Sequence, residues 1–440
     1  MTRTALFPKP IIAIGLSLAL LTTAAPGFTA ESDGIQWVHS LEAAKTQAKA
    51  ENKLIFMDVY AEWCGPCKIM ARDTFPDPTV IKALENYVSV KIDADKAPEI
   101  TRQYRILGVP TLFVLTADGA PLHQESGSLP PEGILALLET AKVRLEKITA
   151  LEKEVHMAPD NVSKAVELAR MYTDTGRAAD AVTLLESTQP KIESVSQSTK
   201  GDFMFALGLA YLLDRAYDKG VQTLEQFVEA QPAHAESERA KDLIPRGKVF
   251  DAMARVDKGE YDQAAKILTQ LTKTSTEPQI TRFAENMLAQ LEVLGKPAPD
   301  WDVTWVGEQS PSPQTLKGKV VALAFVEPEG GQSVEIAQKL QALKQEHGGE
   351  GLETVAIVSS LDGAQAADAA NVRTWIEENS LTCPVAIDGQ GRSTLERYKG
   401  QRTPWFVLIG RDGVVHYLGT FDEGEVRRKL TSLLGVEAPA

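Results

Sequence analysis

The sequence of 440 residues contains only three cysteines, Cys64, Cys67 and Cys383. Proteins that depend on disulfides for stability carry more cysteines, and a loop closed between positions 64 and 67 constrains the unfolded chain very little. The close pair is therefore not expected to be a structural staple. The alternative is that the two cysteines supply two of the four ligands of a zinc ion. However, no second cysteine pair follows, and the six histidines are scattered. We expect no metal and no cofactor.

Long apolar runs and clusters of basic residues are also scarce. Beyond residue 30, no stretch is long and apolar enough to span a membrane, which takes about 20 residues. The formal net charge is −14, without a cluster of Lys and Arg, which argues against nucleic acid as a partner. The hydrophobic fraction of 43% is ordinary for a soluble globular protein, and 440 residues indicate two to four domains.

The first thirty residues differ from the rest. Arg3 and Lys9 precede an apolar run over 11–21, and small side chains are frequent over 22–30. This order is typical of a signal peptide, so we expect residues 1–30 to direct export, with the cleavage point left open. The alternative is an uncleaved segment that anchors the chain to a membrane, although the apolar run is short for a span.

Residues 33–147 alternate between strand and helix patterns. The Asp-Gly pair at 118–119 indicates a hairpin between the last two strands. The expected strands cover 35–38, 54–60, 88–92, 111–115 and 121–124, and the expected helices cover 41–51, 66–72, 78–85, 99–104 and 133–148. Such alternation followed by a hairpin predicts an α/β sandwich around a mixed sheet.

Residues 150–294 show almost no strand pattern and repeat small and large residues at regular spacing instead. The best copy runs from Leu207 to Pro232. The spacing resembles the tetratricopeptide repeat, a helix–turn–helix unit of about 34 residues, with insertions between copies. A solenoid of this type could bind a protein client in a groove or act only as a spacer.

The segment 295–299, GKPAP, looks like a linker, and an α/β pattern returns over 297–437. The stretch 403–413, TPWFVLIGRDG, matches 109–119, VPTLFVLTADG, with the same spacing from proline to Asp-Gly. This duplication predicts the same sheet twice. The predicted fold class is multidomain: an α/β sandwich, a helical solenoid and a second α/β domain of the same kind.

The stretch AEWCGPCK at 61–68 carries the chemistry. A thiolate attacks a disulfide, a mixed disulfide forms, and a second thiol resolves it. We expect Cys64 at the N-terminus of a helix, where backbone N–H groups favour the thiolate, and Cys67 one turn further on. On this reading Cys64 is exposed and Cys67 sheltered. Pro66 suits the first helical turn, because its missing N–H costs nothing there.

AEWCGPCK resembles the active-site motif of the thioredoxin family. The resemblance implies a redox-active disulfide, with Cys64 as nucleophile and Cys67 as resolving thiol. It further implies that Asp58 is the buried acid that exchanges a proton with Cys67, and that Lys91 beside it is a proton relay. A plain strand-end acid and a plain surface lysine are the alternatives. The implied substrate-binding residues are Trp63, Gly65, Pro66, Val109 and Pro110, and Pro110 is also implied as a catalytic cis-proline. The longer stretch 60–84 resembles the C-terminal domain of the DsbD transmembrane reductase.

The second α/β region resembles TlpA-type thioredoxin-like domains, but it lacks their cysteines. Gly330 and Ser333 stand at the two expected cysteine positions, while Pro404 stands at the cis-proline position. This copy is therefore expected to be redox-silent. Cys383 is interpreted as a buried free thiol, with a mixed-disulfide partner for Cys64 as the alternative.

Together these features predict a periplasmic thiol-disulfide oxidoreductase that reduces protein disulfides. Its expected partners are protein disulfide substrates, a DsbD-like membrane electron donor, and a client held in the groove of the repeats. Two alternatives remain open: an oxidase or isomerase using the same cysteines, and a non-catalytic scaffold in which the repeats carry the function. The client, the oligomeric state, the role of Cys383 and the role of the second α/β domain, which lacks the cysteine pair, stay open.

Overall fold

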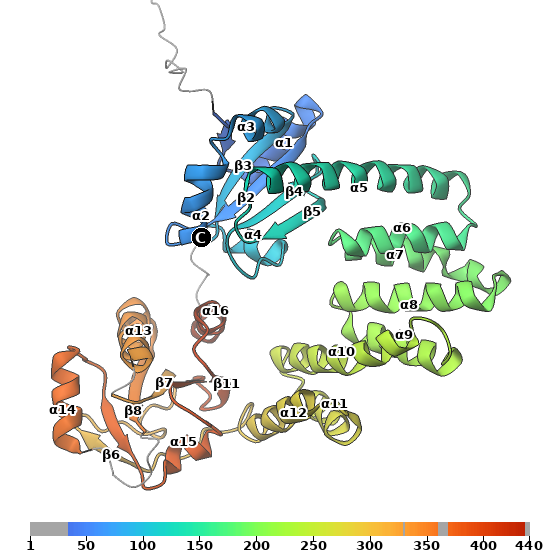
Figure 1. Cartoon of the computed structure of the whole chain (residues 1–440). Coiled ribbons are helices and arrows are strands. Elements are labelled where there is room, and N and C mark those ends of the chain that lie inside the picture. The colour runs from blue at the N-terminus through green and yellow to red at the C-terminus, as the bar shows by residue number, and fades with distance from the viewer. Residues whose placement is uncertain (1–33, 329–330, 360–367, 436–440) are drawn as a thin grey trace, which may run out of the picture. The chain divides into compact units, whose positions relative to one another are not determined.

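The computed structural model describes residues 34–328, 331–359 and 368–435 (Figure 1). The expected signal peptide over 1–30 and Gly330 lie outside these residues. The chain divides into two compact units, Met1–Leu145 and Glu146–Ala440, and each is described by itself. No helix within the described ranges is both long enough and apolar enough to cross a membrane.

The first unit is built around a mixed sheet with the strand order β1-β3-β2-β4-β5. In β2, Ile55, Met57 and Val59 face the helix α1, and Phe56 and Asp58 point to the other face. The strands are β1 (Trp37–Val38), β2 (Leu54–Tyr60), β3 (Tyr87–Asp93), β4 (Thr111–Leu115) and β5 (Pro121–Ser126). The helices are α1 (Leu41–Glu51), α2 (Gly65–Ile69), a π-helical turn (Met70–Thr74), α3 (Pro78–Leu84), α4 (Pro98–Gln103) and α5 (Pro131–Met157), which continues into the second unit.

Local sequence explains where these helices begin and end. The Ser40 side chain accepts a hydrogen bond from the N–H of Ala43 and caps α1, which ends at Asn52 in a left-handed conformation. Asp77 caps α3 through the N–H of Thr79, and Pro78 occupies its first turn. These caps satisfy backbone groups at the ends of the helices and so fix where α1 and α3 begin.

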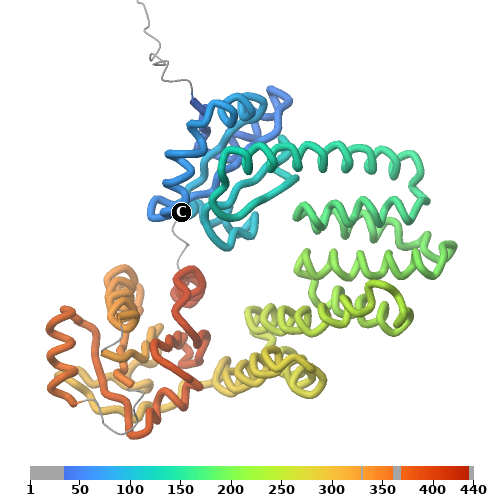
Figure 2. The backbone as a smooth tube through the Cα atoms, in the orientation of Figure 1, coloured from blue at the N-terminus to red at the C-terminus, as the bar shows by residue number. Residues whose placement is uncertain are grey.

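The second unit begins with helices whose consecutive members pack on one another, as the backbone trace in Figure 2 shows. They are α6 (Val162–Asp174), α7 (Ala178–Thr188), a 3₁₀ turn (Gln189–Ser194), α8 (Gln197–Leu213), α9 (Tyr217–Ala230), α10 (Ser237–Asp257), α11 (Tyr261–Thr274) and α12 (Pro278–Leu291). Gly208 and Gly220 allow α8 and α9 to approach closely, because an added Cβ would lie 2.7 Å from Leu224 and 2.6 Å from Leu212, respectively. The likeness of this region to a particular repeat family stays a prediction.

The second unit ends in another mixed sheet, with the order β11-β10-β7-β8-β9-β6. Its strands are β6 (Val303–Val306), β7 (Val320–Val326), β8 (Leu352–Val358), β9 (Val385–Asp388), β10 (Trp405–Ile409) and β11 (Val415–Gly419). Its helices are α13 (Gly331–His347), a 3₁₀ turn (Gly348–Glu350), α14 (Ala369–Glu378), α15 (Ser393–Arg397) and α16 (Glu423–Leu434).

The predicted duplication is confirmed by the two sheets. The order β3-β2-β4-β5 recurs as β8-β7-β10-β11, with the same parallel and antiparallel pairings. Both hairpins also shift register at the same point, where Leu115 pairs with Pro121 and Ile409 pairs with Val415. The predicted fold class, two thioredoxin-like α/β sheets with a helical region between them in the sequence, is confirmed.

The segment after α12 is not a free linker, contrary to the sequence expectation. The N–H of Gly295 donates to the carbonyl of Val415 at 2.8 Å, and the N–H of Val415 donates to the carbonyl of Lys296 at 3.0 Å. Just before it, Val293 and Leu294 belong to one hydrophobic cluster with residues of α11, α12 and the sheet strands β7 and β10. Glycine and proline at 295–299 therefore mark an edge segment paired with β11, which joins the last helices to the sheet.

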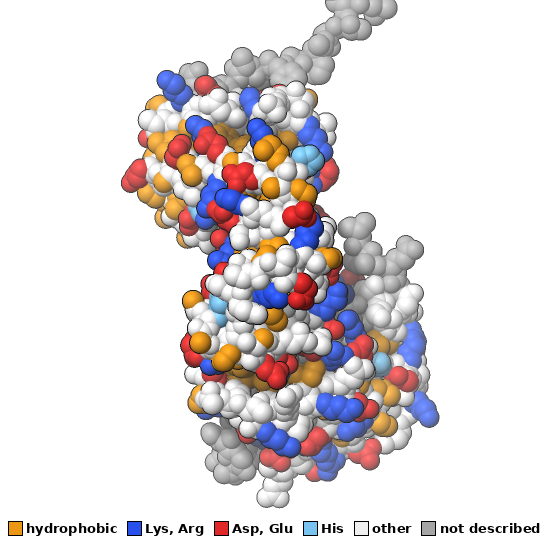
Figure 3. Space-filling model, turned by 90° about the vertical axis from the view of Figure 1, so that its right-hand side faces the viewer, with side chains coloured by type: hydrophobic (Ala, Val, Ile, Leu, Met, Phe, Trp, Pro, Cys, Tyr) orange, Lys and Arg blue, Asp and Glu red, His pale blue; other side chains and the backbone are white. Residues whose placement is uncertain are grey.

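The face drawn in Figure 3 carries acidic and basic side chains that intermingle without a large area of one sign. Hydrophobic side chains lie between them, singly and in small groups. The whole chain has 60 acidic and 46 basic residues and therefore a negative net charge. A net charge of this size limits non-specific association.

Candidate redox site

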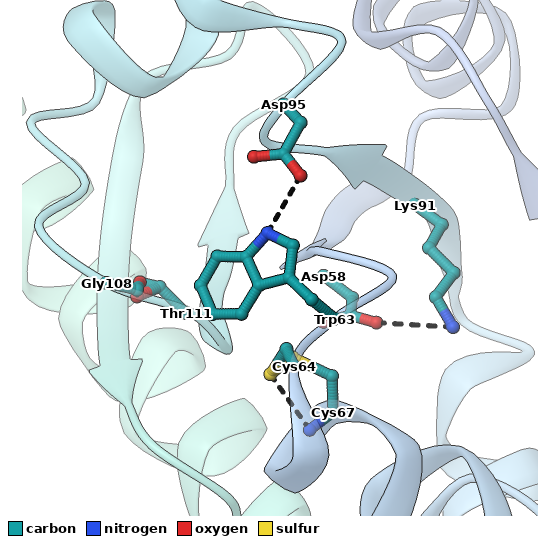
Figure 4. The surroundings of a disulfide bond; sticks show 8 residues. All are labelled: Asp58, Trp63, Cys64, Cys67, Lys91, Asp95, Gly108 and Thr111. Carbon is teal, nitrogen blue, oxygen red and sulfur yellow. Dashed lines mark hydrogen bonds and ion pairs between the residues drawn. A yellow bond between two sulfur atoms is a disulfide. The ribbon is translucent and has the colours of Figure 1, made fainter. Parts of the chain in front are cut away.

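The two close cysteines form a disulfide at the end of β2 (Figure 4). The chain leaves β2, turns through Ala61, and reaches Cys64 as the residue that caps α2. The Cα atoms of Cys64 and Cys67 are 5.3 Å apart, and the N–H of Cys67 donates to the Sγ of Cys64 at 3.1 Å. After reduction this N–H would face a Cys64 thiolate and stabilise its negative charge. Pro66 lies in the first turn of α2, as its fixed φ favours.

The expected contrast in exposure between the two cysteines is wrong for this disulfide form. Cys64 is 2% exposed and Cys67 is 8% exposed, so both are buried and the first is not the more open. The reason is packing: the two cysteines and Ala61 form a small apolar cluster, against which Tyr60 and Val109 pack. The sequence motif gives the spacing of the pair but not what covers it.

Asp58 and Lys91 are directly paired residues of the neighbouring parallel strands β2 and β3. The Lys91 Nζ lies 3.6 Å from the Asp58 Oδ2, with the aspartate side chain 4% exposed and the lysine side chain 21% exposed. Burial raises the pKa of Asp58 to about 6, although the positive charge of Lys91 acts to lower it. A carboxyl group with a pKa near neutrality can both accept and release a proton under ordinary conditions.

The loop before β4 brings Val109 and Pro110 to the site. The Val109–Pro110 peptide bond is cis, and Val109 packs against the cysteine cluster. The loop is fixed at Thr111, whose hydroxyl donates to the carbonyl of Gly108 at 2.7 Å, and by the carbonyl of Pro110, which accepts from the N–H of Gly127 at 2.8 Å.

Trp63 and Gly65 lie on the open side of the site. Trp63 is 71% exposed, and its Nε1 donates to the Asp95 carboxylate at 2.9 Å, which holds the indole ring in place. Space around Gly65 is open, because a Cβ placed there would meet no atom within 4 Å. Sequence reasoning missed Asp95, although its position two residues after β3 was a usable signal, since loops that follow strands often carry site residues.

The corresponding place in the second sheet retains the proline without the cysteines. The Thr403–Pro404 bond is cis, and the Thr403 hydroxyl donates to the Glu327 carboxylate at 3.3 Å. The Oγ of Ser333 is buried and accepts from the N–H of Glu327 at 2.9 Å. A hydroxyl and a carboxylate cannot replace a dithiol in disulfide exchange.

Cys383 is a free buried thiol, and burial raises its pKa to about 11. A thiol that stays protonated is a poor nucleophile. Within the described ranges, no group of three or more His, Cys, Asp and Glu residues is arranged to hold a metal ion.

Comparison with known proteins agrees with this geometry. The family model Thioredox_DsbH, described as "Protein of unknown function, DUF255", matches residues 24–125, and the model Redoxin matches residues 294–434. A stretch of 98 residues is 34% identical to the protein "Thioredoxin" of Mycoplasmoides gallisepticum and covers 94% of it, but only 22% of this chain. The chain belongs to the thioredoxin family.

This thioredoxin-family chain is also similar to part of a larger protein. It is 33% identical over 106 residues to "Thiol:disulfide interchange protein DsbD" of Pseudoalteromonas atlantica, covering 22% of this chain and 18% of DsbD. Among solved structures, a thiol-disulfide isomerase from Corynebacterium glutamicum is 23% identical, with 32% of this chain and 98% of that chain covered and a TM-score of 0.28. The Redoxin match covers the second sheet, whose central strand order repeats that of the first sheet.

Proposed function

We propose that the protein is an exported thiol-disulfide oxidoreductase that reduces disulfides in protein substrates. The observation that carries this proposal is the Cys64–Cys67 disulfide next to a buried Asp58 whose pKa is about 6. A structural crosslink would need no proton acceptor beside it, whereas a dithiol that resolves a mixed disulfide needs one.

The reaction begins with the reduced pair. The Cys64 thiolate attacks one sulfur of the client disulfide, a Cys64–client bond forms, and the other client sulfur leaves as a thiolate that takes a proton. Asp58 in its carboxylate form then accepts the proton of Cys67, directly or through water. The Cys67 thiolate attacks the Sγ of Cys64, the disulfide re-forms, and the second client thiolate leaves and is protonated. Two electrons have passed from the pair to the client.

The direction of electron flow rests on the residues between the cysteines. Gly65 and Pro66 are the spacer of thioredoxin itself, whose reduction potential is about −270 mV. An oxidising periplasm would keep such a pair oxidised unless a donor reduced it. We therefore include in the proposal a periplasmic location and a DsbD-like membrane donor, which the similarity to part of DsbD supports.

The remaining two-thirds of the chain would recruit the client. The helical region and the cysteine-less sheet carry no disulfide, so their part in the proposal is to bind and orient the protein that Cys64 attacks.

Two measurements test the proposal. The first is the redox state of the pair in intact cells, by acid quench and thiol alkylation, in a Cys383→Ala strain so that only two thiols report. A mostly reduced pair is expected, and a mostly oxidised pair would refute reduction as the steady-state function and favour an oxidase.

The second measurement uses Cys67→Ser, which cannot resolve a mixed disulfide. This variant is expected to retain client proteins as complexes that reducing agent releases, whereas the matched Cys64→Ser variant retains none. If both strains grow and process envelope proteins like the wild type, the scaffold alternative is favoured instead.

A further inference from the structure

The ammonium group of Lys91 is surrounded by aromatic rings as well as by Asp58. Its Nζ lies 4.8 Å from the ring centre of Tyr60, 5.4 Å from that of Trp37 and 5.5 Å from that of Phe75. Aromatic faces attract cations at such distances, and the attraction grows when water is excluded. The ammonium group of Lys91 thus lies within 5.5 Å of the centres of three aromatic rings.

The three rings reach Lys91 from separate parts of the chain. Trp37 pairs with Ser89 across the β1–β3 ladder, two residues before Lys91, so that both side chains lie on one face of the sheet. Tyr60 ends β2. Phe75 directly follows the π-helical turn after α2, where its N–H donates to the carbonyl of Met70 at 2.9 Å. π-Helical turns of this kind occur frequently at functional sites.

The rings also support one another. Trp37 and Phe75 meet edge to face with their centres 5.2 Å apart, and Phe56 lies beneath both, with centres at 6.1 and 6.4 Å. Phe75 is buried and Trp37 is half-buried. The aromatic walls are therefore fixed, whereas a lysine side chain alone has four flexible bonds and a strong preference for water.

We propose that Trp37, Tyr60 and Phe75 form an aromatic cage that holds the Lys91 ammonium beside the Asp58 carboxyl, and that the three rings are positioning residues for proton transfer at the disulfide. The inference rests on the proposed function for its kinetic consequence, but the geometry of the cage can be tested without it. Without the rings, Lys91 turns to solvent and Asp58 loses its neighbouring positive charge.

The pKa of Asp58 reports the position of the Lys91 ammonium group, because few other charges act on this carboxyl. Lys91 is the charged group that acts on Asp58, from the neighbouring strand β3. The other charges near the cage, Asp93, Lys96 and Glu62, act on Tyr60, whose pKa is raised mainly by burial. A substitution at Phe75 can therefore change the pKa of Asp58 in two ways: by moving Lys91, or by changing how deeply Asp58 is buried. The experiment must distinguish these two effects.

The test is a double-mutant cycle on the full-length oxidised chain. The pKa of Asp58 is read from the infrared band of its protonated carboxyl, which is assigned by its loss in Asp58→Asn. Phe75→Leu and Trp37→Leu are each expected to raise this pKa by about half a pH unit, since removing one ring weakens the hold on Lys91. Trp37→Phe keeps an aromatic ring at this position, so the pKa of Asp58 is expected to stay at its wild-type value.

The decisive comparison is made in a Lys91→Met background, where the ring substitutions should leave the pKa of Asp58 unchanged. A fall in the pKa would overturn the cage, because the rings would then act only through burial, which raises the pKa of Asp58. An equal change with and without Lys91 would overturn it as well, because the effect would not pass through Lys91. Phe113→Leu is the matched control: Phe113 is a buried ring of the same unit that packs on Tyr104, and its loss should leave Asp58 unaffected.

A kinetic readout separates the cage from the proposed function. The pH profile for reduction of insulin, with dithiothreitol as electron source, should move to higher pH in Phe75→Leu and Trp37→Leu by the same half unit. If the wild type fails to reduce insulin while the carboxyl titrations follow the cycle, the cage stands and the reductase proposal fails. If Phe75→Leu does not fold, Trp37→Leu on the edge strand β1 decides the question alone.

Discussion

Replacing Asp58 by asparagine is expected to stabilise the first unit at pH 8 while it slows the reaction. Burial raises the pKa of Asp58 from 3.8 to about 6, so the folded state resists ionisation of this carboxyl. The stability from the protonated group is fully present below about pH 4 and is lost as the pH rises through 6. Because each pH unit of difference corresponds to about 1.36 kcal/mol, ionisation costs the folded state about 3 kcal/mol at pH 8. Asparagine cannot ionise and avoids this cost.

The free energy of unfolding should therefore increase by up to about 3 kcal/mol at pH 8 in Asp58→Asn, and the gain should vanish at pH 4. The assay is urea-dependent hydrogen exchange by mass spectrometry, followed in peptides that cover β2 and β3, because a chain of several domains has no single unfolding transition. The corresponding peptides of the second sheet, which cover β7 and β8, serve as the internal control, and their hydrogen exchange should not change.

Although Asp58→Asn should stabilise the fold, it should slow the reaction. Loss of the proton acceptor should slow resolution of mixed disulfides about 10²-fold near pH 7, which is the lower end of what general acid–base catalysis contributes. A variant that is less stable than wild type at pH 8, or whose gain in stability is the same at pH 4 and pH 8, would show that Asp58 is ionised at little cost and refute the reasoning.

Three further predictions concern the rest of the chain. Gly220→Ala should lower the stability of the helical region by about 1–2 kcal/mol, because the new Cβ would lie 2.9 Å from the backbone nitrogen of Leu212; thermal unfolding followed by circular dichroism would measure it, and an unchanged melting profile would contradict the packing. Leu294→Ala should lower the free energy of unfolding by about 3 kcal/mol, because Leu294 belongs to a cluster shared by α11 and β10. Hydrogen exchange should show reduced protection in the peptides that cover α11 and in those that cover β10. Reduced protection in only one of the two would mean that the cluster is not shared. Cys383, with its pKa raised to about 11, should resist alkylation by iodoacetamide at pH 8 in the folded oxidised protein and react once urea unfolds it; fast reaction in the native state would disprove its burial.

The strands and helices with strong local patterns could be predicted from the sequence to within a residue or two. β2, β4, β7 and β10 are continuous apolar runs bounded by turn residues, and α1 has both a cap and a left-handed end. β6 could not be predicted, because four residues of mixed character, VTWV, carry too little periodicity to distinguish a strand from a loop. The helix α5 continues to Met157, beyond the expected end at 148, because no residue in 149–157 breaks a helix.

Some features of the site could likewise be predicted from local sequence, and others could not. The spacing of Cys64 and Cys67 and the position of Asp58 follow from a short stretch of sequence, so motif and strand register suffice to bring them together. The burial of Cys64 and the rings around Lys91 depend on residues at 37, 60, 75 and 109, which tertiary packing alone assembles. The pairing of Gly295 with β11 was hidden for another reason: glycine and proline are as suitable at the edge of a sheet as in a linker.

The repetition of one sheet in a single chain creates a problem for folding itself. The hairpin β4–β5 and the hairpin β10–β11 have first strands of equal length, connections of equal length and the same register shift, so each could pair with the central strand that belongs to the other. The order of the chain reduces this risk. The first sheet is complete at Ser126, and β7 begins at Val320, with the helices α5 to α12 between them. Domains fold as units from the N-terminus as the chain emerges, so the first sheet closes its ladder before a competing strand exists. Refolding of the full chain from denaturant removes this order, and should yield more misassembled protein than synthesis does.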